Sequence, residues 1–413
     1  MILLEREEGK IMANVLCLYE EYIATVAGTE KFLKELSEYD GRVVVKSVSI
    51  SKLKYSDFIW CDVLFMIRPN NLHFAKLAKK AQRIGITVVF FLDDDLMNLP
   101  KEYPDMPWRK RGLADSAENS DIIVSSNLRI CKIYGEKYKI SRKVVAETPV
   151  SVKDIINHDN KKNQRIKIVY AAGLAHKVLF DKYIKPILGD LDKKLGDKVS
   201  ITFMGVHPEI NPIEYNMPII FIEPLPFDEY RKKIEQENFD IGLAPLDCTD
   251  FSKCKYYNKF IEYAMFGIVG IYSNTEPYTF VIKNKYNGIL TGDKPENWLE
   301  SICEAVENRT LLDNCRSSSY NLLNTRFNSV TIMDRIIRDI PELIREHTCK
   351  KTSGNFLFLV KITFYVCVVG DYLFKALFYL KRDGVTGLLR GIDRRNNTVK
   401  TERRAERNKQ MRC

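Results

Sequence analysis

The stretch DCTDFSKCKYYNKFIEYAMFGIVGIY, from Asp247 to Tyr272, decides the fold. It follows a short apolar run, Ile241–Pro245, and ends in another, Val269–Ser273. Between them, Tyr256–Phe266 carries apolar residues at helical spacing, which predicts an amphipathic helix. A strand, a helix and a strand in this order predict one βαβ unit, and hence a parallel sheet.

Three charged side chains of this stretch have helical spacing. Lys255, Lys259 and Glu262 stand at i, i+4 and i+7, so we expect them on one face of the helix. Two cations near a helix N-terminus favour an anion such as phosphate. The carboxylate one turn further on can accept two hydroxyl hydrogen bonds, as a ribose would offer. The alternative is an ordinary amphipathic helix with an ion pair between Lys259 and Glu262.

The same alternation of strand and helix patterns runs along most of the chain. The strands expected in the first part are Val15–Tyr19, Val43–Ser47, Val63–Ile67, Thr87–Leu92, Ile122–Ser125 and Lys143–Ala146. After the polar stretch HDNKKNQ, 158–164, the pattern restarts, and the expected strands are Lys167–Ala171, Ser200–Met204, Ile219–Ile222, Ile241–Pro245, Val269–Ser273 and Gly288–Thr291. Helices are expected between them, among others at Thr29–Ser37, Leu72–Ile84, Lys182–Leu195 and Asp228–Gln236. We therefore expect two doubly wound domains, 13–157 and 165–347, with a ligand-binding cleft between them.

Composition excludes several classes of protein. The chain has 413 residues, of which 45% are hydrophobic and 29% charged, so wholesale disorder and a multi-span membrane protein are not expected. Its ten cysteines form no CxxC pair, and no histidine cluster has zinc-ligand spacing. Neither a disulfide framework nor a structural metal is predicted, and no export signal is visible, so we expect a cytoplasmic protein.

The C-terminal region differs from the rest of the chain. Residues 355–382 are mostly apolar and aromatic, and four of their five charged residues share an arc of about 80° on a helical projection. These four residues are Lys361, Asp371, Lys375 and Arg382. The pattern predicts a helix lying in a membrane interface, followed by a tail, 383–413, that binds anionic headgroups. Alternatively, the helix packs on the folded domains and the tail is solvated. No nucleic-acid recognition fold accompanies the tail, so nucleic acid is not an expected partner.

A second candidate for anion binding is AAGLAHK, from Ala171 to Lys177, directly after the first strand of the second half. A glycine at such a turn lets the backbone approach a phosphate closely. Gly173 would leave room for the phosphate, and His176 and Lys177 would add hydrogen bonds and positive charge. A structural helix start is the alternative for His176.

In the first half, VVFFLDDDLMNLP, Val88–Pro100, ends an expected strand with three consecutive aspartates. Asp94 and Asp95 are the candidates for an acceptor-binding or catalytic carboxylate, without a choice between them. A helix N-cap is the alternative. A metal site of the Asp-x-Asp kind would need a single-domain fold, which the repeated pattern of strands and helices contradicts. Arg68 and Gly28 also stand where first-half strands are expected to open onto the cleft. For both residues, a role in a turn or in packing is as open as a role in the cleft. His73 is expected on a helix surface.

The order and spacing of the second-half motifs resemble the donor-binding domain of GT-B glycosyltransferases, specifically the group-1, family-4-like enzymes of bacterial surface polysaccharide synthesis. The matching segments are IGLAPL (Ile241–Leu246), KxxxKFxEYAxxG (Lys255–Gly267), IVGIYS (Ile268–Ser273) and YNGILTGD (Tyr286–Asp293). The resemblance covers about Ile166–Glu304 and departs from the family where a first glutamate is often found, at Cys254.

The resemblance implies two Rossmann-like domains facing each other across a cleft, with Glu262 on the nucleotide ribose. It implies that Lys177, Lys255 and Lys259 face the diphosphate and sugar, and that Gly173 and His176 belong to the donor site. The first domain would bind the acceptor, and the Asp-Asp-Leu segment resembles one that recurs in first domains of these enzymes.

We therefore expect an enzyme that moves a sugar from a nucleotide-diphosphate donor to a lipid-linked or growing glycan acceptor. It would work without a metal or cofactor, at the inner membrane face. A catalytically silent binder of nucleotide sugars or glycans at the membrane is the alternative. A nucleotide-sugar epimerase, which would convert the donor without an acceptor, is a third possibility.

Overall fold

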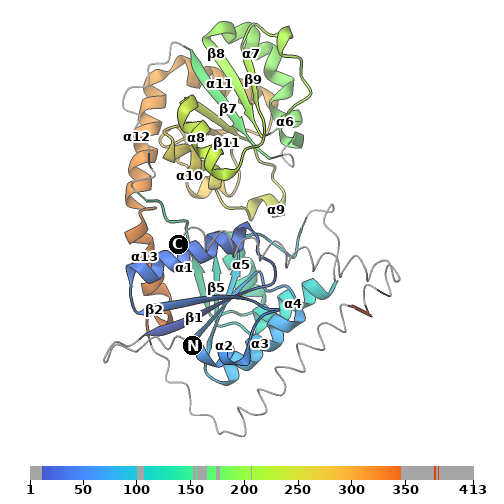
Figure 1. The fold of residues 1–413 in the computed structure, drawn as a ribbon. Coiled ribbons are helices and arrows are strands. Elements are labelled where there is room, and N and C mark those ends of the chain that lie inside the picture. Colours follow the sequence, from blue (N-terminus) through green and yellow to red (C-terminus); the bar gives the residue numbers. More distant parts are fainter. Residues whose placement is uncertain are drawn as a thin grey trace. The chain divides into compact units, whose positions relative to one another are not determined.

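The structure is a computed structural model, and it describes residues 12–99, 107–151, 155, 165–173, 177–205, 207–345, 376, 377 and 380. The chain forms two compact units (Figure 1). The first unit contains Met1–Thr148 and Met333–Cys413, and the second contains Pro149–Ile332. The second domain was expected to run to residue 347, but the residues from Met333 onward belong to the first unit.

The first unit is built on a parallel six-stranded sheet with the order β2-β1-β3-β4-β5-β6. Its strands are β1 (Ala13–Tyr19), β2 (Val43–Ser49), β3 (Val63–Ile67), β4 (Thr87–Leu92), β5 (Ile122–Ser125) and β6 (Arg142–Val145). Every residue of β3 and of β5 is buried, which explains why these strands appear in the sequence as uninterrupted apolar runs. The six strands expected from the sequence are all present.

Helices cover both faces of this sheet: α1 (Ala24–Tyr39), α2 (Tyr55–Trp60), α3 (Leu72–Arg83), α4 (Pro107–Glu118) and α5 (Leu128–Lys137). Figure 1 shows α1 on one side of the sheet and α2 and α3 on the other. Asn71 caps α3 because its side chain accepts hydrogen bonds from the backbone N–H groups of His73 and Phe74. His73 is buried, whereas the sequence predicted a surface position.

The chain returns to the first unit within α13 (Ser329–Asp339). Arg335 donates from Nη1 to Glu147, a buried carboxylate, at 2.7 Å. Glu342 accepts from Arg142, and the two side chains approach to 2.7 Å. In each ion pair the two residues are about two hundred positions apart in the chain. The pairs therefore anchor the segment that contains Arg335 and Glu342 to the first sheet.

The second unit contains another parallel six-stranded sheet, with the order β12-β11-β10-β7-β8-β9. Its strands are β7 (Ile166–Ala171), β8 (Val199–Met204), β9 (Ile219–Ile222), β10 (Ile241–Ala244), β11 (Val269–Ser273) and β12 (Ile289–Thr291). All six correspond to the expected strands. The order places β7 between β8 and β10, so successive connections leave this region in opposite directions.

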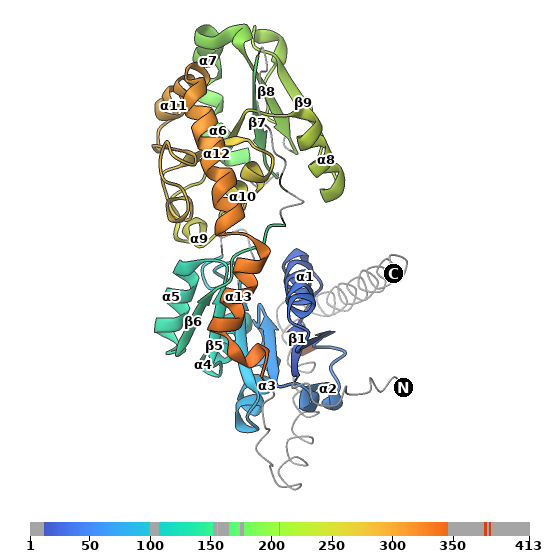
Figure 2. The same cartoon turned by 90° about the vertical axis from the view of Figure 1, so that its left-hand side faces the viewer.

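Two groups of helices cover the second sheet. They are α6 (Lys177–Tyr183), α7 (Leu188–Leu195), α8 (Phe227–Glu237), α10 (Asn258–Met265), α11 (Pro295–Glu307) and α12 (Arg309–Thr325). Figure 2 shows α7 and α11 on one side of the strands and α8 on the other. The single helix expected over Lys182–Leu195 is broken at Pro186, which lies in a short 3₁₀ turn, Lys185–Ile187. Proline has no N–H for the helix ladder, which accounts for the break.

The expected interfacial helix, 355–382, lies outside the described residues except for 376, 377 and 380, and the basic tail, 383–413, lies outside them entirely. Within the part of the chain that the structure describes, no helix has the length and apolar character needed to cross a bilayer.

Candidate functional site

A pocket of about 430 Å³ lies at the carboxyl ends of the central strands of the second sheet. In open α/β sheets, ligands bind where the direction of the connections reverses, and here that point is beside β7. Four strand ends and two helices contribute to the wall. Residues from these elements include Gly173, Gly205, Glu223, Pro245, Lys259 and Glu262.

Lys259 and Glu262 both lie on α10, one turn apart, and both line the pocket. Lys259 Nζ donates to Glu262 Oε1 at 2.9 Å and to Oε2 at 3.1 Å. About a quarter of each side chain is exposed, 28% and 24% respectively. The ion pair between Lys259 and Glu262, which was the structural alternative for these two residues, is therefore present. However, both side chains line the pocket.

A third side chain, Tyr230 on α8, completes this group. Its hydroxyl donates to Glu262 Oε1, and Lys259 Nζ lies 3.4 Å from the same hydroxyl and 5.7 Å from the ring centroid. Burial raises the pKa of Tyr230 above its ordinary value, and the nearby carboxylate of Glu262 adds to that effect. The phenol therefore keeps its proton and acts as a hydrogen-bond donor to the carboxylate.

Lys255 was predicted on the same helix face as Lys259 and Glu262, but it lies outside α10. The helix begins only at Asn258, and Lys255 follows a separate short helix, α9 (Asp250–Lys253). The backbone N–H of Lys255 bonds to Ser252, and its ammonium group lies 5.6 Å from the centroid of the Phe251 ring. The expected i, i+4, i+7 geometry therefore holds for Lys259 and Glu262 alone.

The other donor-site candidates are placed differently. Gly173 lines the pocket, and a Cβ added there would have no heavy atom within 4 Å. Lys177 begins α6, where its ammonium group bonds to Glu209 at 2.7 Å, and it does not line the pocket. His176 lies outside the described residues.

The charge of the pocket wall differs from the expectation of several lysines. Among the described residues that line it, Lys259 is the one cation, and Glu223 and Glu262 are carboxylates. Lys177 bonds to Glu209, and the ammonium group of Lys255 lies over the Phe251 ring. An anionic ligand would therefore depend on Lys259 and on backbone N–H groups at the strand ends.

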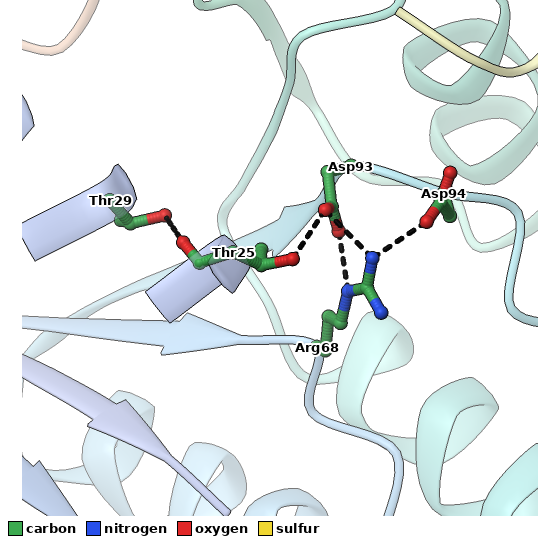
Figure 3. A network of polar contacts seen from close by, with 5 residues as sticks. All are labelled: Thr25, Thr29, Arg68, Asp93 and Asp94. Atoms are coloured by element: carbon green, nitrogen blue, oxygen red, sulfur yellow. Dashed lines mark hydrogen bonds and ion pairs between the residues drawn. The ribbon is translucent and has the colours of Figure 1, made fainter. Parts of the chain in front are cut away.

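A second polar cluster lies in the first unit, also at the carboxyl ends of central strands (Figure 3). Arg68 follows β3 and Asp93 and Asp94 follow β4, the next strand in the sheet. The guanidinium group donates to Asp93 from Nε at 2.5 Å and from Nη2 at 2.7 Å, and Nη2 also lies 2.6 Å from Asp94 Oδ2. Thr25, at the start of α1, donates to Asp93 Oδ2 at 2.6 Å.

The backbone of Arg68 adopts a left-handed conformation, with φ of 46°. A non-glycine residue in this region is strained, and such strain is often found at functional sites. Burial lowers the pKa of the Arg68 guanidinium, but the hydrogen bonds and negative charges of Asp93 and Asp94 together outweigh that effect and raise the pKa overall. The strained residue is therefore held by the two aspartates, and it remains charged.

Asp95 has a structural position rather than the substrate-facing one expected. It is 1% exposed, and it accepts hydrogen bonds from the Tyr134 hydroxyl at 2.7 Å, from Asn98 Nδ2 at 2.7 Å and from the backbone N–H of Met97 at 3.2 Å. These bonds fix the turn after β4. Of the two candidates, Asp94 therefore remains, with 32% of its side chain exposed. Gly28 lies inside α1 and not at a strand end.

Sequence reasoning missed Tyr230 and Asp93 as members of these clusters. No sequence signal connects Tyr230 with Glu262, because 32 residues separate them and the contact depends on how α8 and α10 pack. For Asp93 a signal existed, since it is the first residue after a strand adjacent to the one that Arg68 follows. In the described part of the chain, no group of three or more His, Cys, Asp or Glu residues is arranged to hold a metal ion. The expected independence from metal stays a prediction.

No protein-family model and no curated protein sequence matches the chain. Among solved structures, the Anabaena protein HepE, in complex with UDP and glucose, is similar with a TM-score of 0.57 at 12% identity, over 80% of this chain and 99% of that one.

Two further solved structures agree with this likeness. The lipopolysaccharide outer core galactosyltransferase WaaB gives a TM-score of 0.54 at 12% identity, over 79% of this chain and 99% of that one. Sucrose-phosphate synthase from Thermosynechococcus elongatus gives 0.55 at 10% identity, over 80% and 99%. The two parallel six-stranded sheets and this likeness confirm the predicted fold, and the chain has the two-domain GT-B fold of glycosyltransferases.

Proposed function

We propose that this protein is a glycosyltransferase that takes a sugar from a nucleotide-diphosphate donor bound in the pocket of the second unit. One observation carries the proposal. Lys259 and Glu262 stand side by side in a pocket at the switch point of a doubly wound sheet. An ammonium group complements a diphosphate, and a carboxylate complements a pair of ribose hydroxyls.

The proposed reaction breaks the bond between the anomeric carbon and the diphosphate oxygen. The acceptor hydroxyl oxygen forms the new glycosidic bond and releases its proton to solvent, and the nucleotide diphosphate leaves with an added negative charge. Lys259 would stabilise that charge as it develops, and a fixed cation in a partly buried pocket does this better than water. Glu262 would hold the ribose and so fix the position of the phosphates.

We assign acceptor binding to the first unit, with Asp94 as the residue in contact with an acceptor hydroxyl. Its side chain is 32% exposed, and its Oδ2 lies 2.6 Å from Arg68 Nη2. Arg68, held in a strained conformation by Asp93, would orient Asp94. A charge-assisted hydrogen bond from the acceptor hydroxyl to this carboxylate would orient the attacking oxygen.

The names of two similar structures suggest the classes of donor and acceptor. HepE was solved with UDP and with UDP-glucose, which makes UDP the first nucleotide to test. The name of WaaB refers to the lipopolysaccharide outer core, which agrees with a lipid-linked or growing glycan acceptor in polysaccharide synthesis. We propose the same class of acceptor here.

The proposal includes attachment to the inner membrane face through residues 355–413. It is supported by the amphipathic sequence pattern and by the tail 383–413, which contains half of the chain's excess positive charge. Flotation of the full chain with vesicles tests this part. Binding to vesicles with anionic lipid, and loss of binding when Arg403, Arg404 and Arg407 are replaced by Gln, is the expected result. Equal flotation of both proteins would contradict it.

Calorimetric titration with UDP, GDP and ADP, followed by transfer assays with the sugar derivatives of the nucleotide that binds, tests the proposed activity. Micromolar to millimolar binding of one nucleotide and release of that nucleotide in the presence of a glycan acceptor is the expected result. Absence of binding for all three nucleotides would contradict the donor site.

One observation favours a second candidate, a nucleotide-sugar binder without turnover. Cys254 occupies the place where related enzymes often have a glutamate, and it is fully buried, so it cannot touch a sugar. Nucleotide binding without transfer to any of a panel of glycan acceptors would support this candidate.

A further inference from the structure

The hydrogen-bonding capacity of Glu262 limits what its carboxylate can bind. An ionised carboxylate has about four acceptor positions, two on each oxygen. Oε1 accepts from the Tyr230 hydroxyl and from Lys259, and Oε2 accepts from Lys259. One acceptor position therefore remains, on Oε2, whereas a pair of ribose hydroxyls requires two.

The second position can come from Lys259. A bound diphosphate would attract the ammonium group of Lys259, because Lys259 is the one cation among the described residues lining the pocket. If the ammonium group turns toward a bound diphosphate, both of its bonds to Glu262 break. Two acceptor positions then open, and among the described contacts the Tyr230 hydroxyl remains as the partner of the carboxylate.

Tyr230 is suited to hold the carboxylate during this exchange. It comes from α8, a different helix from the one that carries Glu262, and it lines the same pocket. A phenol on a rigid ring has few rotatable bonds, so its hydroxyl position is set by the packing of the helix. Lys259, in contrast, has a long flexible side chain that reaches either partner.

We propose that Tyr230 is a positioning residue that keeps the Glu262 carboxylate aimed at the donor's vicinal hydroxyls when Lys259 turns to the diphosphate. This inference deepens the proposed function and rests on it. The contact couples hydroxyl recognition to diphosphate recognition: Lys259 blocks the diol position until a diphosphate draws it away. The site then selects ligands that contain both groups.

The test compares UDP with 2′,3′-dideoxyuridine diphosphate, which keeps the base and diphosphate but lacks the diol. Affinities are measured by calorimetry on the full chain and on the Tyr230→Phe variant, which removes a single hydroxyl. We expect the variant to bind UDP about tenfold to a hundredfold more weakly, the usual range for one hydrogen bond to a charged group, and the dideoxy nucleotide within twofold of the wild type.

Tyr278 provides the matched control, because it lines the same pocket and is not bonded to Glu262 in the described contacts. Tyr278→Phe is expected to change the two affinities by equal factors. An equal loss for both nucleotides in Tyr230→Phe would show a general packing role and overturn the inference. Tighter binding of UDP by that variant would show that Tyr230 blocks the diol position, and this too would overturn it. If the wild type binds neither nucleotide, the proposed function itself fails.

Discussion

Arg68 donates two parallel hydrogen bonds to Asp93, from Nε at 2.5 Å and from Nη2 at 2.7 Å, and in doing so joins the ends of two adjacent strands. A bidentate pair of this kind fixes both position and orientation. It offsets the strain of the left-handed backbone at Arg68. The same pair presents the neighbouring Asp94 at the carboxyl edge of the first sheet.

Removal of this guanidinium should destabilise the first unit. Arg68→Ala leaves Asp93 with Thr25 as its described partner and is expected to lower the free energy of unfolding by about 1–3 kcal/mol. Urea unfolding of variant and wild type measures the difference. Arg68→Lys keeps the charge but not the fork, so an intermediate loss is expected. An unchanged free energy of unfolding in both variants would mean that the Arg68–Asp93 pair does not stabilise the first unit.

Asp94 and Asp95 should separate into one functional and one structural residue. Asp95→Ala leaves the buried hydroxyl of Tyr134 without its carboxylate acceptor, so a loss of about 1–3 kcal/mol in unfolding free energy is expected. Asp94→Asn is expected to unfold close to the wild type but to lose most of the sugar transfer. Comparison of urea unfolding with transfer rate decides, and the reverse pattern would show that the two residues are misassigned.

The three lysines proposed from the sequence should differ in their effect on nucleotide affinity. Lys259→Ala is expected to weaken UDP binding by about tenfold to a hundredfold, the range for loss of a charge-assisted hydrogen bond. Lys177→Ala, which breaks a surface pair with Glu209, is expected to stay within about twofold. Calorimetric titration of both variants provides the comparison. Equal losses would indicate that Lys177 reaches the ligand after all.

Gly173 should tolerate a side chain in the folded protein but not in the complex. A Cβ at this position meets no protein atom within 4 Å, and the residue lines the pocket. Gly173→Leu is therefore expected to change the unfolding midpoint little and to weaken UDP binding at least tenfold, because the side chain fills ligand space. Gly205→Leu is the contrasting variant. Its φ of 78° and a clash with the Ala172 carbonyl oxygen predict a large loss of stability. Full UDP affinity in Gly173→Leu would place the nucleotide elsewhere.

Buried thiols should make the protein less stable at alkaline pH. Burial raises the pKa of Cys17 to about 12 and that of Cys315 to about 11, whereas an unfolded thiol titrates near 8.5. Above that value the unfolded chain binds fewer protons than the native one, so stability falls as pH rises toward 11 or 12. Each thiol contributes a slope of about 1.4 kcal/mol per pH unit. Urea unfolding between pH 8 and 10.5 should show a shallower slope for Cys17→Ala than for the wild type, and identical slopes would contradict the assignment.

Most of the fold could be predicted from the sequence because both sheets are parallel. Strands such as β3 are buried on both faces, and they therefore appear as apolar runs separated by helical patterns. The boundaries depended on local geometry that the patterns do not contain. Pro186 interrupts the helix expected over Lys182–Leu195, and α10 begins after Tyr257, which leaves Lys255 outside it.

The candidate site was predictable where residues share one helix. Lys259 and Glu262 needed only helical spacing to be placed together. Tyr230 came from the packing of α8 against α10, which no local pattern encodes. Asp95 was indistinguishable from Asp94 in the sequence, because its role depends on a buried hydroxyl from α5, Tyr134. Lys177 pairs with Glu209, a contact 32 residues away that cannot be read from spacing.

The most direct test of the central claim is a crystal structure of the full chain grown with UDP. We expect UDP in the pocket beside β7, with the ribose hydroxyls on the Glu262 carboxylate and the diphosphate within hydrogen-bond reach of Lys259 Nζ. Tyr230 should still be bonded to Glu262. A nucleotide bound away from α10, or a pocket without nucleotide at saturating UDP, would contradict it.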